Sequence, residues 1–280
     1  MSLSETKVPQ LKAVVLVDNI GHQGLTGEWG LSIYIKYGDR RLLLDTGASG
    51  LFLKNARKMK LPMKKIDCAV LSHAHYDHAD GMKTFFACND HAGFYVRKET
   101  AENCYAKKWI FHKYIGIPRH VLQEYRQRIY YVEGDYKLYS GVWLIPHKTP
   151  GLEQIGRREK MDLRTENGWR PDNFAHEQSL VFETERGLVI FNSCSHGGAA
   201  NIINEVAATF PDKKVYGLIG GFHLFNKTEG EIRALAEEIR KTGIAYVCTG
   251  HCTGERAYEI MKKELGENLH QLHVGLMMKF

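Results

Sequence analysis

Three histidines and an aspartate lie within six residues, in the run His73-Ala74-His75-Tyr76-Asp77-His78. In an extended loop, side chains two residues apart point to the same side, so His73 and His75 can share one ion. Asp77 and His78 lie just beyond, where the chain turns toward the next helix, and can reach a second ion. Imidazole nitrogens with few oxygens suit zinc, with iron, manganese or cobalt as alternatives. The spacing therefore predicts a site for two divalent metal ions rather than a set of structural histidines.

The histidine run follows an apolar segment, residues 66–72, that is typical of a buried strand. Residues 11–18 form another short apolar run. Residues 31–37 alternate between apolar and polar side chains, and a Gly-Asp turn joins them to the apolar residues 41–45. A helix is expected over residues 50–59. The first part of the chain thus predicts strands and one helix that lead to a loop of metal ligands.

The second half of the chain repeats this order. Residues 178–183 and 188–192 predict a hairpin that leads into a loop bearing His196. Two later strands, at residues 214–219 and 245–248, end close to His223 and His251, and helices are expected at residues 199–209 and 229–241 and again up to residue 265. Two sheets packed face to face with helices outside would satisfy the layer rule. The site would then form where strand ends from both halves meet.

The middle of the chain has a different character. Residues 85–130 are mixed, aromatic and basic, and we interpret them as a helical insertion with helices near residues 97–108 and 119–128. Residues 150–175 are polar, punctuated by Gly and Pro and poorly periodic, which indicates a long lid loop. Both segments are expected to belong to a single domain that spans residues 1–280.

Two motifs together resemble the metallo-β-lactamase superfamily: the His-x-His-x-Asp-His run and the preceding Leu44-Asp45-Thr46-Gly47. Later motifs fit one branch best, namely the one named after an archaeal 7,8-dihydropterin-6-methyl-4-(β-D-ribofuranosyl)aminobenzene 5'-phosphate synthase, which also contains metal-dependent hydrolases. These motifs lie at residues 27–33, 177–180, 194–198, 220–224 and 251–254. The resemblance covers essentially the whole chain. It implies the α/β class and a four-layer αβ/βα sandwich.

The resemblance also assigns roles to residues of this chain. It implies that His73, His75 and His196 hold the first ion, whereas Asp77, His78 and His251 hold the second. Asp45 would be a buried carboxylate behind the ligands that orients their loop. Asp77 and His223 are the candidate catalytic residues, because each could take part in proton transfer.

The chain departs from the family pattern at two motifs. Many hydrolases of the superfamily place a bridging aspartate after the strand that corresponds to residues 188–192, and here the nearest candidates are Cys194 and His196. The third motif reads Thr-Pro-Gly-Leu at residues 149–152 and lacks its histidine. His196 is the candidate substitute for that ligand.

Several further residues keep alternative interpretations. His223 is either a ligand, a proton donor or a hydrogen-bonded structural histidine. His147 and His176 are expected on the lid side, in structural or substrate contacts rather than metal binding. Cys252 is interpreted as a small buried thiol rather than as a ligand.

Composition excludes several classes of protein. Hydrophobic residues make up 44% of the chain and charged residues 25%, as in soluble globular proteins, and the net charge is +6. The first residues carry no apolar signal segment, and no window approaches the ~20 apolar residues of a membrane span. The six cysteines show no disulfide spacing and indicate free thiols in the cytoplasm. We expect no nucleic acid or membrane partner; the sequence leaves open whether the chain forms a homo-oligomer.

The function predicted from these features is metal-dependent hydrolysis through a metal-activated water. A small anionic, phosphate-containing substrate is preferred because of the basic residues between 97 and 128, although these also fit a solvated surface. Two groups of residues bear on the substrate. The cations Arg157, Arg158 and Lys160 could meet an anion, and the aromatic residues Trp109, Phe111, Tyr114 and Trp169 could either wall a pocket for a planar ring or form a small core.

The alternatives come from different classes. One is a transferase that joins a dihydropterin-methyl diphosphate to an aminobenzene ribofuranosyl phosphate, as the branch name implies. Another is a non-hydrolytic di-iron redox protein or a metal sensor. Fold does not decide between these chemistries.

Overall fold

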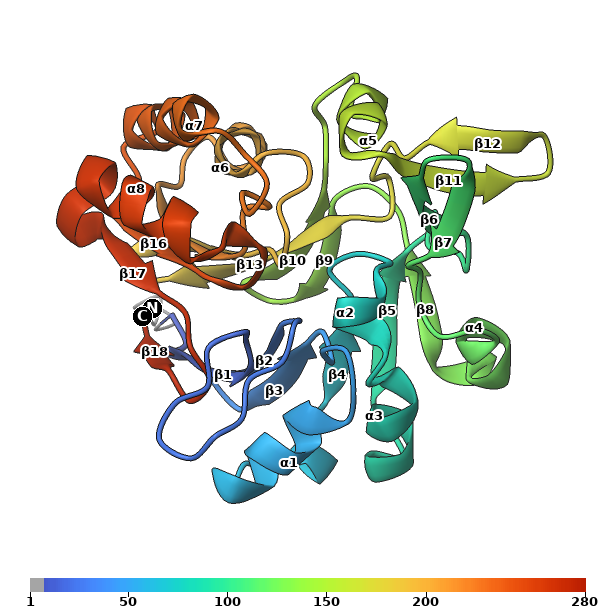
Figure 1. The fold of residues 1–280 in the computed structure, drawn as a ribbon. Helices are drawn as coiled ribbons and strands as arrows, with labels where there is room; N and C mark the ends of the chain where they lie inside the picture. Colours follow the sequence, from blue (N-terminus) through green and yellow to red (C-terminus); the bar gives the residue numbers. More distant parts are fainter. Residues whose placement is uncertain (1–7) are drawn as a thin grey trace.

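The computed structural model describes residues 8–280, and two seven-stranded sheets packed face to face form its centre (Figure 1). The first sheet has the order β18-β1-β2-β3-β4-β5-β8. Its strands are β1 (Leu11–Val17), β2 (Ser32–Tyr37), β3 (Arg40–Leu44), β4 (Cys68–Val70), β5 (Gly93–Arg97), β8 (Ile129–Val132) and β18 (Met277–Lys279). The chain thus returns to its first strand at its end.

The second sheet has the order β17-β16-β15-β14-β13-β10-β9. Its strands are β9 (Tyr136–Tyr139), β10 (Val142–Pro146), β13 (Gln178–Thr184), β14 (Gly187–Phe191), β15 (Val215–Gly220), β16 (Tyr246–Thr249) and β17 (Leu269–Gln271). The predicted hairpins appear as β2–β3 and β13–β14. In both sheets, the strands that precede the histidine loops belong to parallel runs, β3-β4-β5 in the first sheet and β14-β15-β16 in the second, which brings their carboxyl ends to one edge.

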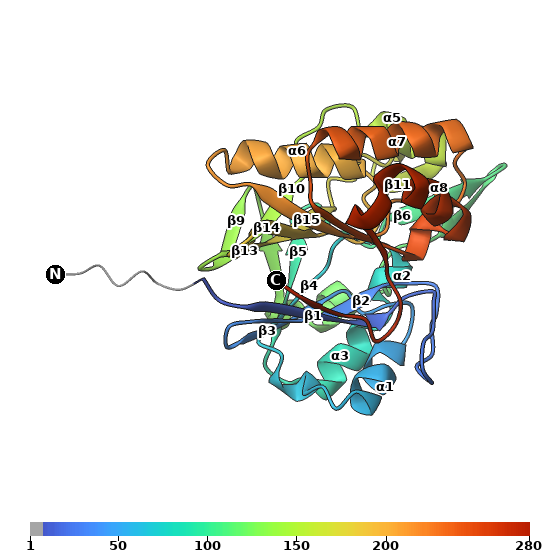
Figure 2. The same ribbon diagram turned by 90° about the vertical axis from the view of Figure 1, so that its left-hand side faces the viewer.

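Helices cover the outer faces of both sheets (Figure 2). The first sheet carries α1 (Leu51–Lys58) and α3 (Met82–Cys88), and the second carries α6 (Ala199–Thr209), α7 (Glu229–Lys241) and α8 (Glu255–Leu265). This arrangement confirms the predicted four-layer αβ/βα sandwich. In the part of the chain that the structure describes, no helix is long and apolar enough to cross a membrane.

Successive side chains of a strand point to opposite faces of the sheet, and this alternation builds the core. In β2, Ile33 and Ile35 point into the layer between the sheets, where they join Phe182 and Phe191 of the second sheet. Tyr34 points the other way and packs with Phe52 of α1. This period of two is the expected consequence of burying both faces of a sheet.

One glycine keeps the second sheet closely packed near the site. Gly220 ends β15 with φ +151, and a Cβ added there would lie 1.4 Å from the carbonyl oxygen of Asn192. Only glycine can therefore let the ends of β14 and β15 approach so closely.

The prediction of a helical insertion at residues 85–130 is wrong, because strands replace the main predicted helix. The segment predicted as a helix at 97–108 contains β6 (Cys104–Lys108), and β7 (Phe111–Tyr114) follows it. The predicted helix at 119–128 is reduced to α4 (Val121–Glu124) and a short 3-10 turn. The aromatic residues Tyr105, Phe111 and Tyr114 favour strands, and β6 is held as a strand by pairing with β11, far along the chain.

The predicted lid loop at residues 150–175 is also wrong, because the segment is ordered into regular elements. It contains α5 (Glu153–Glu159), β11 (Met161–Thr165) and β12 (Gly168–Pro171). The two strands pair with β6 and β7 to form a four-stranded sheet in the order β12-β11-β6-β7. The strands of the two middle segments thus stabilise each other by pairing. The sequence of either segment alone does not show this pairing. Figure 1 shows this third sheet projecting beside α5.

Candidate metal centre

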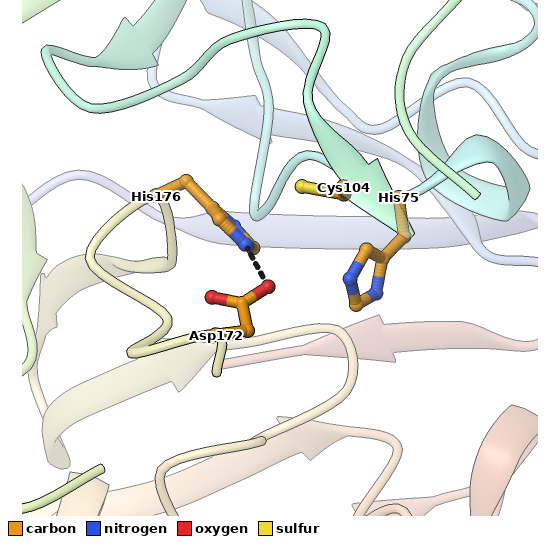
Figure 3. A group of neighbouring side chains, drawn as sticks. All are labelled: His75, Cys104, Asp172 and His176. Atoms are coloured by element: carbon orange, nitrogen blue, oxygen red, sulfur yellow. Dashed lines mark hydrogen bonds and ion pairs between the residues drawn. The ribbon is translucent and has the colours of Figure 1, made fainter. Parts of the chain in front are cut away.

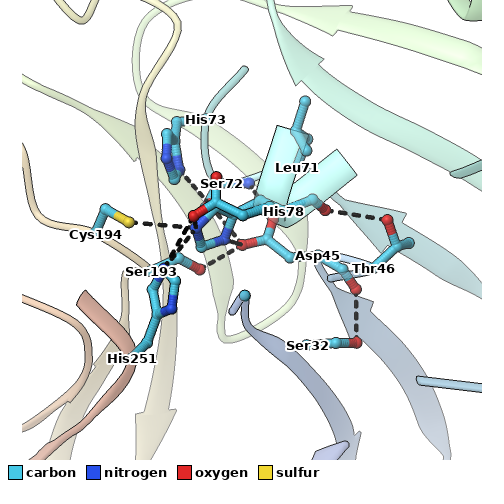
Figure 4. Close-up of polar contacts among 12 residues, drawn as sticks. Ser32, Asp45, Thr46, Leu71, Ser72, His73, His78, Ser193, Cys194 and His251 are labelled. Atoms are coloured by element: carbon cyan, nitrogen blue, oxygen red, sulfur yellow. Dashed lines mark hydrogen bonds and ion pairs between the residues drawn. The ribbon is translucent and has the colours of Figure 1, made fainter. Parts of the chain in front are cut away.

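Three loops from distant parts of the chain converge at the carboxyl ends of the parallel strands (Figure 4). The loop after β4 carries the histidine run and continues into the short helix α2 (Tyr76–Ala79). The loop after β14 carries Cys194 and His196, and the loop after β16 carries His251. The structure brings all six predicted ligands together. Each of them is buried to 7% exposure or less.

The first group consists of His73, His75 and His196. The ring centroids of His73 and His75 lie 4.6 Å apart, and each lies 5.0 Å from the ring of His196. The Nε2 atoms of all three rings are buried without a hydrogen-bond partner among residues 8–280. Buried polar atoms are otherwise almost always hydrogen-bonded. These three unpaired nitrogens therefore indicate a binding site for a metal ion, which accepts their lone pairs.

The second group consists of His78, His251 and Asp77. The Nε2 atoms of His78 and His251 lie 3.2 Å apart. Asp77 Oδ2 lies 3.3 Å from His251 Nε2 and 3.6 Å from His78 Nε2. In a tetrahedral zinc site with bonds of roughly 2.0–2.1 Å, neighbouring ligand atoms are about 3.3 Å apart. The donor types and their spacing fit one divalent ion.

Hydrogen bonds behind the histidines set which ring nitrogen is free. Asp45 Oδ2 accepts a hydrogen bond from the Ser72 hydroxyl at 2.6 Å and lies 2.8 Å from His78 Nδ1. Because the single hydroxyl proton of Ser72 goes to Asp45, the Ser72 Oγ must accept from Nδ1 of His73, 2.8 Å away. His73 and His78 are thereby held in the tautomer whose Nε2 carries a lone pair.

The same logic applies to His251. The Asn19 side chain donates from Nδ2 to the carbonyl oxygen of His251 at 3.1 Å, which orients its Oδ1 toward the ring. His251 Nδ1 lies 3.1 Å from that Oδ1 and must donate to it. Asp18 accepts the backbone N–H of His251 at 2.8 Å. The β1–β2 loop therefore fixes a ligand that follows β16.

Cys194 belongs to both groups. Its Sγ is 3.2 Å from His78 Nε2, and it clusters within ligand distance both with His73 and His196 and with His78 and His251. The sequence left open whether Cys194 is a ligand. Its position between the two groups is the one that a bridging ligand would occupy.

Electrostatics agree with these roles in the first group. Burial, followed by the neighbouring imidazoles, lowers the pKa of His73 and His196 well below the usual value, and burial lowers that of His75 to about 3. These rings are neutral, as a metal ligand must be.

In the second group burial opposes a charge on His78, but Asp77 and Asp45 raise its pKa to about 10, so a metal ion has to displace the proton on its Nε2. Burial alone would raise the pKa of Asp77, but His78 and His251 hold it well below its ordinary range. Asp77 is therefore better suited to be a charged ligand than a proton acceptor.

Backbone strain concentrates at this centre. Asp45, Ser195, His223 and His251 adopt φ values of +56, +53, +49 and +46. Non-glycine residues seldom take this conformation, and such strain clusters at functional sites.

A buried cluster behind the ligand loop gives His176 structural contacts, one of the two kinds expected of it. His75, Cys104, Asp172 and His176 lie together (Figure 3). His176 Nδ1 accepts the backbone N–H of Ala74 at 3.1 Å, and its Nε2 pairs with Asp172 at 3.0 Å. Because both ring nitrogens are used, His176 holds the ligand loop between His73 and His75.

His147 also has a structural role. Its Nε2 lies 3.0 Å from Glu177 and its Nδ1 lies 3.1 Å from Glu205. The other carboxylate oxygen of Glu177 accepts the backbone N–H of His196 at 3.1 Å. Burial opposes a charge on His147, but Glu177 and Glu205 raise its pKa to about 10.

We expect this ion pair to give a distinct pH dependence of stability. An unfolded histidine has a pKa near 6.5, so the contribution of His147 is full below about pH 6.5 and is lost as the pH rises toward 10. Between about pH 6 and pH 9.5, the metal-free wild type should lose on the order of 4 kcal/mol more unfolding free energy than the His147→Gln variant. Urea titrations measure this difference. Parallel pH profiles would contradict the prediction.

His223 lies at the mouth of the first group. Its ring centroid is 4.6 Å from that of His196, and its Nδ1 is buried without a hydrogen-bond partner in the described chain. It lines a cavity of about 270 Å³ together with His196, Arg158 and Glu159. Glu159 pairs with Lys227, which fastens α5 to the loop after β15. A ligand atom of His223 also lies within 4.8 Å of the sulfurs of Cys194 and Cys252, so its ring borders both the cavity and these two thiols.

The sequence interpretation missed several supporting residues. Asn19 contacts a ligand 232 positions along the chain, whereas Asp172 and Ser72 contact histidines four residues and one residue away. Their signals were weak, since an isolated Asn or Asp in a loop usually favours a turn. The three predicted anion-binding cations also separate, because Arg158 faces the cavity of His223 whereas Arg157 and Lys160 line another one.

Comparison with known proteins finds relatives that share this fold over nearly the whole chain. A curated relative from Methanocaldococcus jannaschii, 7,8-dihydropterin-6-methyl-4-(β-D-ribofuranosyl)-aminobenzene-5'-phosphate synthase, is 27% identical over 100% of both chains. The crystal structure of a metal-dependent hydrolase of the β-lactamase superfamily matches with TM-score 0.81 and 29% identity, covering 96% of this chain and 99% of that one. A metallo-β-lactamase fold protein from Bacillus subtilis shares the fold, with TM-score 0.59 and 13% identity over 97% and 100% of the two chains. The family model of the metallo-β-lactamase superfamily matches residues 26–251. The chain belongs to the metallo-β-lactamase superfamily.

Proposed function

We propose that the protein is a binuclear metal-dependent hydrolase that acts on a small, anionic, phosphate-containing substrate. The observation that carries this proposal is the set of buried Nε2 lone pairs of His73, His75 and His196 beside the group of Asp77, His78 and His251. Bound divalent ions would lower the pKa of a water and polarise a phosphoryl oxygen. Zinc suits these ligands best.

The chain's own residues supply the remaining parts of the reaction. Asp45, Ser72 and Asn19 hold three ligand rings in the required tautomer. We propose that His223 passes a proton to the leaving group, because its partnerless Nδ1 lies beside His196 and it lines the adjoining cavity. Arg158 lines the same cavity and can contact an anion there.

A transferase is the second candidate, and a specific observation favours it. The synthase from M. jannaschii matches this chain from end to end. In such a reaction the same ligands would hold ions that neutralise a diphosphate leaving group, and the cavity beside His223 would admit an aromatic amine instead of water.

A product assay separates the two candidates. The metal-loaded protein is incubated with phosphomonoesters, phosphodiesters and a dihydropterin-methyl diphosphate, with and without an aminobenzene ribofuranosyl phosphate. A hydrolase releases phosphate or alcohol with water alone, and the activity disappears in His75→Ala. Diphosphate release that requires the aminobenzene compound would overturn hydrolysis in favour of the transferase.

A further inference from the structure

A second cavity lies on the four-stranded sheet, away from the candidate metal ligands. It has a volume of about 460 Å³, within the range of small-molecule sites. Residues of β6, β12 and the end of α5 line it, and none of the nine lining residues is a candidate metal ligand. The α5 helix takes part in both cavities, since Arg158 lines the one beside His223 and Arg157 lines this one.

The charge of this cavity is strongly positive. Lys107, Arg157, Lys160 and Arg170 line it, and none of the four forms an ion pair with a carboxylate within residues 8–280. Asp162 is its one acidic lining residue, and it is engaged with His112 at 2.9 Å. Four uncompensated cations around one hollow favour a ligand with more than one negative charge.

Flat aromatic surface accompanies these charges. The rings of His112 and Trp169 stack at 3.7 Å and 4°, and the contact of His112 with Asp162 fixes this wall. Trp109, by contrast, is 87% exposed and stacks on no other ring in the described chain. An exposed indole at the rim of a basic cavity can stack on a planar ring.

Two of the lining residues are held in a costly backbone conformation. Trp109 is the first residue of the two-residue turn between β6 and β7, where Lys108 pairs with Phe111, and its φ is +59. Hairpin turns of this length prefer Gly, Asn or Asp at such positions. Lys160 has φ +57 at the end of α5, where glycine is usual. Non-glycine residues in this strained conformation indicate that their side chains have a functional role rather than a stabilising one.

We propose that this cavity is a second binding site, for a small molecule in which a planar ring carries a phosphate group. Arg157 and Arg170 bind the phosphate, and Trp109 stacks on the ring. The site does not depend on the metal-dependent reaction proposed above, because it shares no lining residue with the candidate metal ligands.

Calorimetric titration of the metal-loaded protein with adenosine 5'-monophosphate, phenyl phosphate and inorganic phosphate tests this proposal. Both ring-bearing phosphates should bind at least about tenfold more tightly than inorganic phosphate. Arg157→Ala combined with Arg170→Ala should weaken all three by about tenfold or more. The control Arg126→Ala, which removes an exposed arginine of the short 3-10 turn after α4 that does not line the cavity, should leave them unchanged.

Trp109→Gly separates binding from folding. Glycine suits the positive φ, so the variant should unfold at the same or a higher temperature than the wild type, yet lose about tenfold in affinity for the two ring-bearing phosphates only. In His75→Ala, which removes a candidate metal ligand, the site lined by Arg157 and Arg170 should bind the ring-bearing phosphates with unchanged affinity. The proposal is overturned if no ring-bearing phosphate binds, if Trp109→Gly binds them as well as the wild type does, or if binding disappears in His75→Ala.

Discussion

Replacing Asp45 by alanine is expected to destabilise the protein by about 3–5 kcal/mol and to abolish tight metal binding. The Asp45 carboxylate is fully buried and accepts hydrogen bonds from the backbone N–H and hydroxyl of Ser72 and from the hydroxyl of Ser193. It also fixes the ring of His78. Alanine would leave these donors without an acceptor and would release two ligand rings from their tautomer. Chemical denaturation and metal titration measure the two effects.

Asp45→Asn is the matched control because it keeps the size of the side chain. The Asn oxygen can still accept from the Ser72 backbone N–H, so the loss of stability should be smaller. The metal affinity should still fall by about 10–100-fold, since an amide nitrogen cannot accept from His78. An Asn variant that binds metal as the wild type does would show that Asp45 has no part in positioning the ligands.

His75→Ala and His251→Ala should each leave the protein with one bound ion. Each should also reduce turnover by more than about 100-fold, which exceeds the roughly 10–100-fold loss expected when a residue that only orients a ligand is replaced. The two histidines belong to different groups, so each variant should lose a different ion. Metal content by mass spectrometry and steady-state kinetics check this. His270→Ala, on β17, is the matched control and should retain both ions.

The outcome that contradicts this prediction is specific. If His251→Ala keeps two ions, the group of Asp77, His78 and His251 is not a metal site. If either variant retains full turnover, the corresponding ion has no role in the reaction. Loss of folding is distinguished by the circular dichroism spectrum of each variant.

The sequence predicted the sandwich well because its signals are local. Alternation in residues 31–37 and the apolar run at 188–192 report burial within a strand, and both strands appear where they were expected. The histidine run was equally informative, since four ligand-type residues within six positions seldom occur together outside a metal site.

The middle of the chain could not be predicted in the same way. Whether residues 104–108 form a strand depends on β11, more than fifty residues later, and whether residues 150–175 are ordered depends on β6 in turn. Each segment is ambiguous alone, and only their pairing resolves it.

The supporting contacts of the site were beyond sequence reasoning for a related reason. Asn19 and His251 are 232 positions apart, and nothing near Asn19 marks it as a partner of a histidine. Cys194 was a candidate bridge from its position after β14, but only the fold places its sulfur beside His78. Type and spacing predict ligands, whereas the residues that orient them depend on tertiary contacts.

The most direct test of the two-ion centre is anomalous scattering at the zinc edge from crystals of the zinc-reconstituted protein. We predict two peaks, one among His73, His75 and His196 and the other among Asp77, His78 and His251, with the sulfur of Cys194 between them. A single peak, or no peak among these side chains, would contradict the account.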